Sequence, residues 1–399
     1  NSTEYKSFIK NNKIEKNKIS EIEMYKIRNL SNDDNASSNE PTLAPNIYHH
    51  SFVNKKNMNY EVKLNAHEIK DDEGYDIQRW SGNAQIEKIM QSGEYELKFN
   101  GETGLDLYAI NDRPSSDQND NKYMERLSLG FALTASKETI RNYQQSNLFL
   151  KPTIQFSSMY STDRKEDIPN RDSSDFRLDS SNLFFVNQFQ GRDNIQTNHR
   201  INYGLNSAVI SNEYGDIEFF LGQSQRVGGT ENNTLISNPD RMSNIINNIS
   251  WNFSENTNIS WDSLYDNETL KTNYSNISLN SKIFGIDFST SHSSLDGTLV
   301  NGNEDREEYT ISLSKKHDNW NFGYISKYDL SNDNTEQITE EIVIDYTEEY
   351  MFQNCLNVKL SFKNNGGSVD RDLKPENSIY LTFSFRNLGD YDYKAPSLF

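Results

Sequence analysis

The stretch YTISLSKKHDNWNFGY, residues 309–324, indicates most directly which fold the chain adopts. Apolar residues stand at every second position on both sides of a polar turn at 316–319: Tyr309, Ile311, Leu313, Trp320, Phe322 and Tyr324. A period of two residues puts apolar side chains on one face of a strand and polar side chains on the other. The stretch therefore predicts an antiparallel hairpin whose two strands share an apolar face.

The same alternation recurs along the chain. It is found in residues 60–66 and 249–261, and again in residues 378–385, where one face carries Ile379, Leu381, Phe383 and Phe385. Runs of about ten residues lie between clusters of Gly, Asn and Asp, and a tilted strand needs about that length to cross a bilayer. No run approaches the ~18 apolar residues of a transmembrane helix, and no helical periodicity of useful length is seen. The chain is predicted to be all-β.

The connections between these runs alternate in length. Long polar connections are expected near 31–43, 111–122, 160–197, 228–240, 292–305, 330–336 and 363–376. Tight turns are expected near 54–57, 90–93, 211–214, 254–257, 280–282, 316–319 and 347–350. Outer-membrane barrels have short periplasmic turns and long extracellular loops, so this alternation predicts a transmembrane antiparallel β-barrel of roughly eighteen strands, give or take about two.

Composition agrees with a wall one residue thick between lipid and water. Of the 399 residues 34% are hydrophobic, yet Tyr and Phe number 22 and 21, and the formal net charge is −19. The alternative is a partly disordered acidic protein, which the regular alternation disfavours. No basic stripe is present to neutralise phosphates, so nucleic acid is not an expected partner. The chain begins without Met or a signal peptide and is expected to be a mature form or a fragment.

Residues 168–205 interrupt the alternation with a long polar segment. Connections above about 15 residues are usually functional or disordered, and the apolar residues between 176 and 189 argue against disorder. We expect a folded loop over 160–197. Its aspartates, Asp172, Asp175, Asp179 and Asp193, lack the spacing of a calcium-binding loop. We expect them to close the loop's own turns and to pair with Arg164, Arg171, Arg177 and Arg192; plugging or gating of the barrel is a compatible role.

No catalytic or metal-binding pattern emerges from the sequence. The six histidines have no ligand spacing, and no Ser/His/Asp or Cys/His constellation can be argued. We therefore expect no enzyme activity, no cofactor and no metal. Cys355 has no second cysteine in the chain, so it is either free or bonded to a partner outside it.

The central segment resembles the LPS-assembly protein (LptD) family of the Gram-negative outer membrane. The residues that carry the resemblance are Pro169, Asn170, Asp172, Ser173, Asp175, Phe176, Asp179, Asn182, Leu183, Phe184, Asn187, Phe189, Gly191, Asp193, Arg200 and Tyr203-Gly204-Leu205. Further likeness lies in residues 41–48, 221–223 and 378–389, and in residues 104–108, where Gly104 replaces an expected Arg.

The resemblance implies a role in assembling lipopolysaccharide into the outer leaflet, through a barrel lumen and a lateral seam. It implies a luminal loop or gate containing Asp172, Asp175, Phe176, Asp179, Asn182, Phe184, Asn187, Gly191, Asp193 and Arg200. The seam would be flanked by the last strand, 378–385. Cys355 would form a disulfide with an N-terminal domain that this chain does not contain. The implied partners are a lipoprotein plug, a periplasmic bridge protein, the barrel-assembly machinery and outer-membrane lipids.

Three segments follow from this interpretation. Residues 1–20 would be a poorly patterned segment or a frayed strand, residues 21–388 the barrel domain, and residues 389–399 a C-terminal tail. The chain would correspond to the C-terminal two-thirds of a larger barrel. The alternatives are a general diffusion porin, for which Phe399 would be the terminal aromatic, and a barrel enzyme such as an outer-membrane lipase or protease. Pro396 argues against a terminal strand of the porin type.

Overall fold

The computed structural model describes residues 4–15, 18–29, 42–55, 57–70, 76–111, 122–162, 177–189, 191–211, 213–229, 241–297, 305–331, 336–348, 356–365, 376–385 and 389–394. These residues form one antiparallel sheet of 21 strands, which confirms the all-β prediction. Among them there is no helix of the length and apolarity that a membrane-spanning helix requires. Four residues of predicted function, Asp172, Asp175, Phe176 and Cys355, lie outside the described residues.

The strands follow one another around the sheet in chain order. Their bounds are β1 Glu4–Glu15, β2 Lys18–Asn29, β3 Thr42–Lys55, β4 Met58–Lys70, β5 Asp76–Ser92, β6 Tyr95–Asn111, β7 Lys122–Lys137, β8 Thr139–Asn142, β9 Ser146–Ser161, β10 Asn198–Ser211, β11 Asp216–Gly229, β12 Ile245–Ser254, β13 Thr257–Tyr265, β14 Thr272–Ile283, β15 Ile286–Leu295, β16 Arg306–His317, β17 Trp320–Asp329, β18 Glu336–Glu348, β19 Leu356–Asn365, β20 Glu376–Phe385 and β21 Gly389–Lys394. β8 prolongs β7 past Glu138, and both pair with β9. Counted as one crossing, they leave twenty strands, at the upper limit of the expected number.

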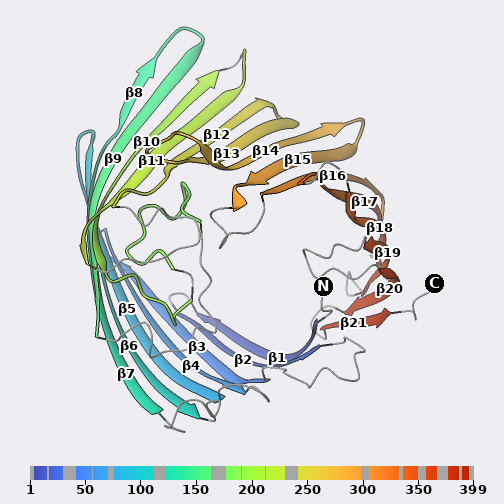
Figure 1. Cartoon of the computed structure of the whole chain (residues 1–399), viewed down its shortest axis with the longest axis horizontal. Coiled ribbons are helices and arrows are strands. Elements are labelled where there is room, and N and C mark those ends of the chain that lie inside the picture. The colour runs from blue at the N-terminus through green and yellow to red at the C-terminus, as the bar shows by residue number, and fades with distance from the viewer. Residues whose placement is uncertain are drawn as a thin grey trace.

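The sheet curls into an incomplete ring (Figure 1). Within the described residues β1 pairs only with β2, and β21 only with β20. The sheet therefore has two edges, one at each end of the chain.

Tight and long connections alternate along the chain, as predicted. Two-residue turns join β5 to β6, β12 to β13, β14 to β15 and β16 to β17, whereas the β9–β10 connection runs from 162 to 197. Several tight turns use a positive φ, including Gly93 (62°), Phe284 (52°), Gly285 (74°) and Asp318 (50°). Two-residue hairpin turns favour this backbone region because its twist matches that of the strands.

The two faces of the sheet differ in chemistry. Large apolar side chains lie exposed on the outer face, among them Leu64, Leu105, Leu129, Leu133, Ile154, Leu221, Ile342 and Leu360. Leu381 and Ile379 share this face, because they pair in register with Leu360 and Phe362. The residues between them point inward and are mostly polar. An apolar outer band with a polar interior is the arrangement of a membrane barrel.

The structure corrects the predicted ends of the chain. Ser378–Phe385, expected to be the last strand, is not at the edge of the sheet, because β21 pairs with β20 on the side away from β19. Residues 389–394 are thus a strand rather than part of a tail. They alternate Asp and Tyr, a period of two that six residues make hard to recognise. At the other end, β1 and β2 pair along their full lengths, so residues 4–15 form a complete strand rather than a frayed one.

Candidate functional site: the loop on the inner wall

Residues 177–189 and 191–197 of the long β9–β10 connection lie on the inner face of the sheet, inside the ring (Figure 1). They are here called the luminal loop. Two apolar side chains anchor it. Leu183 is fully buried in a cluster with Phe220, Ile246 and Leu264 on β11, β12 and β13. Val186 packs on Ala132 and Met159 of β7 and β9.

Glycines in the wall provide the space for these two anchors. A Cβ atom on Gly222 would lie 2.6 Å from Leu183 Cδ2, and one on Gly130 would lie 2.8 Å from Val186 Cγ1. Carbon atoms in van der Waals contact are about 3.5–4.0 Å apart, so a larger residue at either position would displace the loop anchor or the wall side chains Met159 and Phe220.

A buried ionic cluster holds the C-terminal arm of the loop. Asp193 Oδ1 accepts hydrogen bonds from Arg79 Nη1 of β5 at 2.6 Å and from the Tyr108 hydroxyl of β6 at 3.3 Å. Arg126 of β7 donates from Nη1 to the Asp193 carbonyl at 2.8 Å, and also to the carbonyl of Arg192. Three adjacent strands therefore bind one loop residue.

Arg126 also ties the wall to itself. Its Nε and Nη2 donate to Asp106 Oδ2 at 3.0 and 2.8 Å, and Nη2 donates to the Tyr108 hydroxyl at 2.8 Å. Arg126 is fully buried, and Asp106 is 2% exposed. Removing one partner of such a pair leaves a charge in a poorly solvated place, which typically costs about 3–5 kcal/mol.

Polar side chains from three further strands reach the first turn of the loop. Ser224 Oγ donates to Asn202 Oδ1 at 2.6 Å, and Asn202 Nδ2 donates to Gln155 Oε1 at 2.8 Å. Gln155 Nε2 in turn donates to the Phe184 carbonyl at 2.9 Å. The side chains of Ser224, Asn202 and Gln155 thus form a chain of hydrogen bonds that ends on the backbone of the loop.

Arg200 of β10 bridges the two arms of the loop. Its Nη2 donates to the carbonyls of Val186 at 2.6 Å and Phe185 at 3.2 Å, and its Nη1 donates to Gln196 Oε1. Its side chain is buried, so these bonds form away from water. Arg200 therefore fixes the distance between the entering and leaving chain.

The loop also carries its own turn contacts. Asp179 Oδ1 accepts the N–H groups of Ser181 at 2.8 Å and Asn182 at 3.2 Å, and Asn182 Oδ1 accepts the N–H of Asp179 at 2.9 Å. Asn187 Oδ1 accepts the N–H of Gln196 at 3.2 Å. Gly191 supplies a positive φ of 88°. The Asx bonds expected for Asp179 are present.

Sequence reasoning identified part of this arrangement. Of the predicted residues within the described part of the chain, the structure brings into the loop and its anchor points Asp179, Asn182, Phe184, Asn187, Gly191, Asp193 and Arg200. Asp193 pairs with Arg79 of β5, a partner that was not predicted, and two of the expected arginines, Arg164 and Arg171, lie outside the described residues. Arg192 lies instead 3.7 Å from Asp106. Arg79 and Arg126 were missed, although an arginine on the polar face of a strand is a signal that could have pointed to them.

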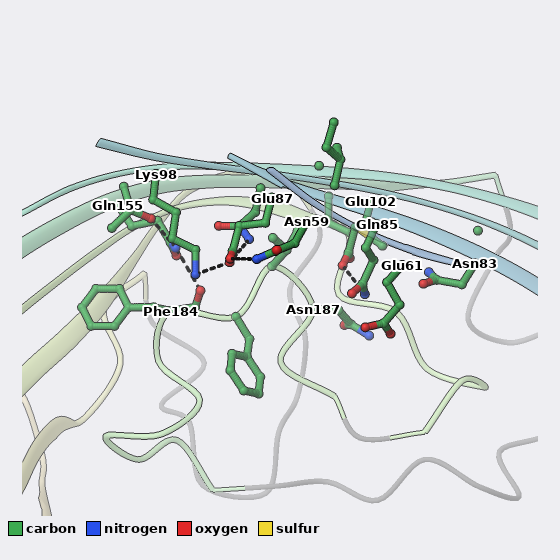
Figure 2. Close-up of a pocket in the computed structure, with 18 of the residues that line it drawn as sticks. Asn59, Glu61, Asn83, Gln85, Glu87, Lys98, Glu102, Gln155, Phe184 and Asn187 are labelled. Atoms are coloured by element: carbon green, nitrogen blue, oxygen red, sulfur yellow. Dashed lines mark hydrogen bonds and ion pairs between the residues drawn. The ribbon is translucent and has the colours of Figure 1, made fainter. Parts of the chain in front are cut away.

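A cavity of about 860 Å³ lies between the luminal loop and the inner face of β4, β5, β6, β7 and β9 (Figure 2). Its charged lining consists of the carboxylates Glu61, Glu87, Glu96, Glu102 and Asp106 and the cations Lys63, Lys98, Lys151 and Arg192. Most of these charges are paired along the wall: Glu87 with Lys98 at 2.5 Å, Glu96 with Lys151 at 3.4 Å, and Glu61 with Lys63. In the described part of the chain no group of three or more His, Cys, Asp or Glu is arranged to hold a metal ion.

Comparison with known proteins places the chain in a family. The model of the family described as LptD, LPS transport system D, matches residues 10–325. The chain belongs to the LptD family. The match runs from β1 to β17 and includes the luminal loop and its anchor strands, so the resemblance in residues 168–205 is confirmed. No match was found among curated proteins.

Solved structures share the fold of this LptD-family chain. The siderophore receptor PirA of Acinetobacter baumannii is 9% identical, with a TM-score of 0.53 over 96% of this chain and 71% of that chain. The ferric enterobactin receptor PfeA of Pseudomonas aeruginosa is 7% identical, with a TM-score of 0.54 over 96% and 70%. Both are large barrels, and at this identity the likeness concerns the fold alone. The chain is an outer-membrane β-barrel protein of the LPS transport system.

Proposed function

We propose that this chain forms the wall of a channel that places lipopolysaccharide in the outer leaflet of the outer membrane. The sugar part passes along the polar inner face, and the lipid part leaves sideways at the sheet edges. One observation supports this most: a sheet with an apolar outer face and a polar inner face ends in the edge strands β1 and β21. A lipid that crosses such a wall needs a place where strands separate, because paired backbone groups do not open easily in lipid.

The luminal loop acts as the gate of this channel. It covers the inner face near the ends of β6 and β7 that meet the long connection 112–121, and near the adjacent end of β5, where Asp193 meets Arg79, Tyr108 and Arg126. Long connections face the cell exterior in such barrels. The loop therefore closes the outer side of one half of the lumen.

Membership of the family supports a set of proposed partners. Lipopolysaccharide arrives from a periplasmic bridge protein, a lipoprotein plug fills part of the lumen, and the barrel-assembly machinery inserts the chain among outer-membrane lipids. Cys355 forms a disulfide with a cysteine of another domain. The chain works as a transport protein and performs no catalysis of its own.

Depletion of the protein in its host tests the proposal. Newly made lipopolysaccharide is followed by surface labelling, and a plasmid-borne wild-type copy is the control. Export through this channel predicts that surface labelling falls while lipopolysaccharide accumulates on the periplasmic side. Unchanged surface labelling together with reduced uptake of small solutes would instead identify a diffusion porin.

A further inference from the structure

The cavity behind the luminal loop contains polar groups that the protein itself leaves available. Within the described residues Glu102 has no ion pair, and the contact made by its side chain is a hydrogen bond from Gln85 Nε2 at the long distance of 3.4 Å. Asn187 uses its Oδ1 for the loop backbone, which leaves the two donors of its Nδ2. Figure 2 shows Gln85, Glu102 and Asn187 reaching into the same part of the cavity.

The wall keeps space open around these groups. Gln85 and Glu102 are direct cross-strand partners on the inner face, and Asn83, the next inward residue of β5, pairs with Gly104. Gly104 has no side chain to cover the Asn83 amide. Three amides and the carboxylate of Glu102 thus border one open region, which the Lys63-paired Glu61 also lines, and this set can both donate and accept hydrogen bonds.

The loop supplies an aromatic surface to the same cavity. Phe185 lines it and is 57% exposed, although the neighbouring residues Phe184 and Val186 pack against the wall. An exposed aromatic ring in a cavity that amides and a carboxylate also line suits a ligand with an apolar face and a polar rim. A pyranose ring has this character, since its C–H bonds cluster on one face and its hydroxyls point outward.

Charge narrows the choice of ligand. The lining has five carboxylates and four cations, and three of the cations are lysines already paired with Glu61, Glu87 and Glu96. The fourth cation, Arg192, has its Nη1 3.7 Å from Asp106 Oδ1. An anionic ligand would have to compete with one of these carboxylates for its cation and would face Glu102 as well. An uncharged sugar meets no such penalty, and an ammonium group would gain from Glu102.

We propose that this cavity, bordered by Asn83, Gln85, Glu102, Phe185 and Asn187, is a binding site for an uncharged or amine-bearing saccharide unit. Its volume of about 860 Å³ lies within the range of about 300–1,000 Å³ typical of small-molecule sites. The inference rests on the proposed function, because it names the part of a glycolipid that pauses at the inner wall. The site discriminates against phosphorylated sugars.

The test uses the purified full-length protein in detergent and saturation-transfer NMR with three probes. These are methyl α-glucopyranoside, glucosamine and glucose 6-phosphate. We expect binding of the first two, with the phosphate at least about tenfold weaker, a difference equal to about 1.4 kcal/mol. Absence of transfer to the methyl glucoside, or equal binding of the phosphate, overturns the proposal.

Two variants assign the binding to this cavity. Phe185→Ala should weaken binding of the methyl glucoside about tenfold, whereas Phe253→Ala should not change it. Phe253 is a matched control because it is 58% exposed and lies on β12 away from the cavity. Glu102→Gln should weaken glucosamine more than the methyl glucoside. Equal effects of the two phenylalanine variants place the sugar elsewhere and refute the site.

The depletion experiment in cells and the sugar-binding experiment can each give a negative result independently of the other. If depletion leaves surface lipopolysaccharide unchanged while the purified protein still binds the methyl glucoside through Phe185, the transport proposal falls and the saccharide site stands. If depletion blocks export while no sugar binds, the reverse holds. A heat-dependent shift in gel mobility checks that each variant is a folded barrel.

Discussion

The two halves of the sheet are built differently. Strands β5 to β13 carry the luminal loop on their inner face, and β5, β6 and β7 bury charged side chains there, including Arg79, Asp106 and Arg126. Strands β15 to β20 bury mainly small hydroxyl groups on their described residues, such as Ser326, Ser361 and Ser378. β5 and β6 are 17 residues long, whereas β15 and β17 have 10 each.

This difference shows where each half obtains its stability. In the first half the luminal loop forms a second layer on the sheet. It supplies partners for buried charges and apolar anchors, which a single sheet cannot provide. In its described residues the second half is a single layer, so these strands depend on their backbone ladder and on lipid against their outer face. Substitutions should therefore act on the first half through the loop and on the second through the membrane.

The largest expected effect comes from Asp193→Ala. It takes the carboxylate from Arg79 and should destabilise the docked loop by about 3–5 kcal/mol. Hydrogen exchange of residues 191–197 is the measurement, and faster uptake of large antibiotics by cells is the functional readout. The matched control is Asp287→Ala on β15, whose side chain is 55% exposed and lies 3.5 Å from Lys282. If Asp287→Ala had as large an effect as Asp193→Ala, the two halves of the sheet would not differ in the source of their stability.

Leu381→Arg tests the dependence of the second half on lipid. A charge on the lipid-facing side costs about 2–4 kcal/mol near the middle of the membrane, so the yield of heat-modifiable barrel should fall. Thr382→Arg is the control, because the next residue of β20 points to the lumen. Normal insertion of Leu381→Arg would show that the two faces of β20 have been exchanged.

Gly222→Ala probes the fit between loop and wall. The added methyl group would lie 2.6 Å from Leu183 Cδ2, and overpacking of this kind costs typically about 1–3 kcal/mol. Urea denaturation in detergent and protease cleavage within residues 177–189 measure the loss. In Gly82→Ala the new atom lies 3.5 Å from Leu64 Cδ2, an ordinary contact, so this variant should behave like the wild type. Equal stability of the two variants would contradict close packing of Leu183.

The smallest effect concerns the largely exposed connection 266–271, which joins β13 to β14. The backbone N–H and then the hydroxyl of Thr269 bind the Asp266 carboxylate and lower its pKa. A carboxyl with a lowered pKa stabilises the folded state above its ordinary pKa, and this contribution is lost as the pH falls through the lowered value. Asp266→Ala should speed amide exchange at Thr269 by on the order of fivefold near neutral pH and have no effect at strongly acidic pH. A pH-independent effect would exclude the carboxylate as the cause.

Much of the fold could be predicted, because apolar and polar residues alternate with a period of two along the strands. The turn between β14 and β15 shows the limit. It was expected near 280–282, but it falls at Phe284 and Gly285, and Phe284 is 96% exposed at a positive φ. A large apolar residue is not a turn signal, and only the register with β15 places it there.

The site was harder to predict than the strands. Asp193 stood out within a polar segment, yet its partner Arg79 is 114 residues away in the chain. Which arginine meets a given aspartate depends on the order of strands around the sheet and on the path of the loop across it. Neither is contained in a local pattern, so Arg126, Gln155 and Asn202 looked like ordinary inward-facing residues.

The Asp193 contact also has a consequence for the order of folding. Its partners come from β5, β6 and β7, and the loop follows all of them in the chain. The contact cannot form until those strands are paired and curved, and closing a long segment is slow because its entropy is lost before any bond is gained. Loop docking is therefore a late event in biogenesis, and its completion reports that this half of the wall has been assembled in register.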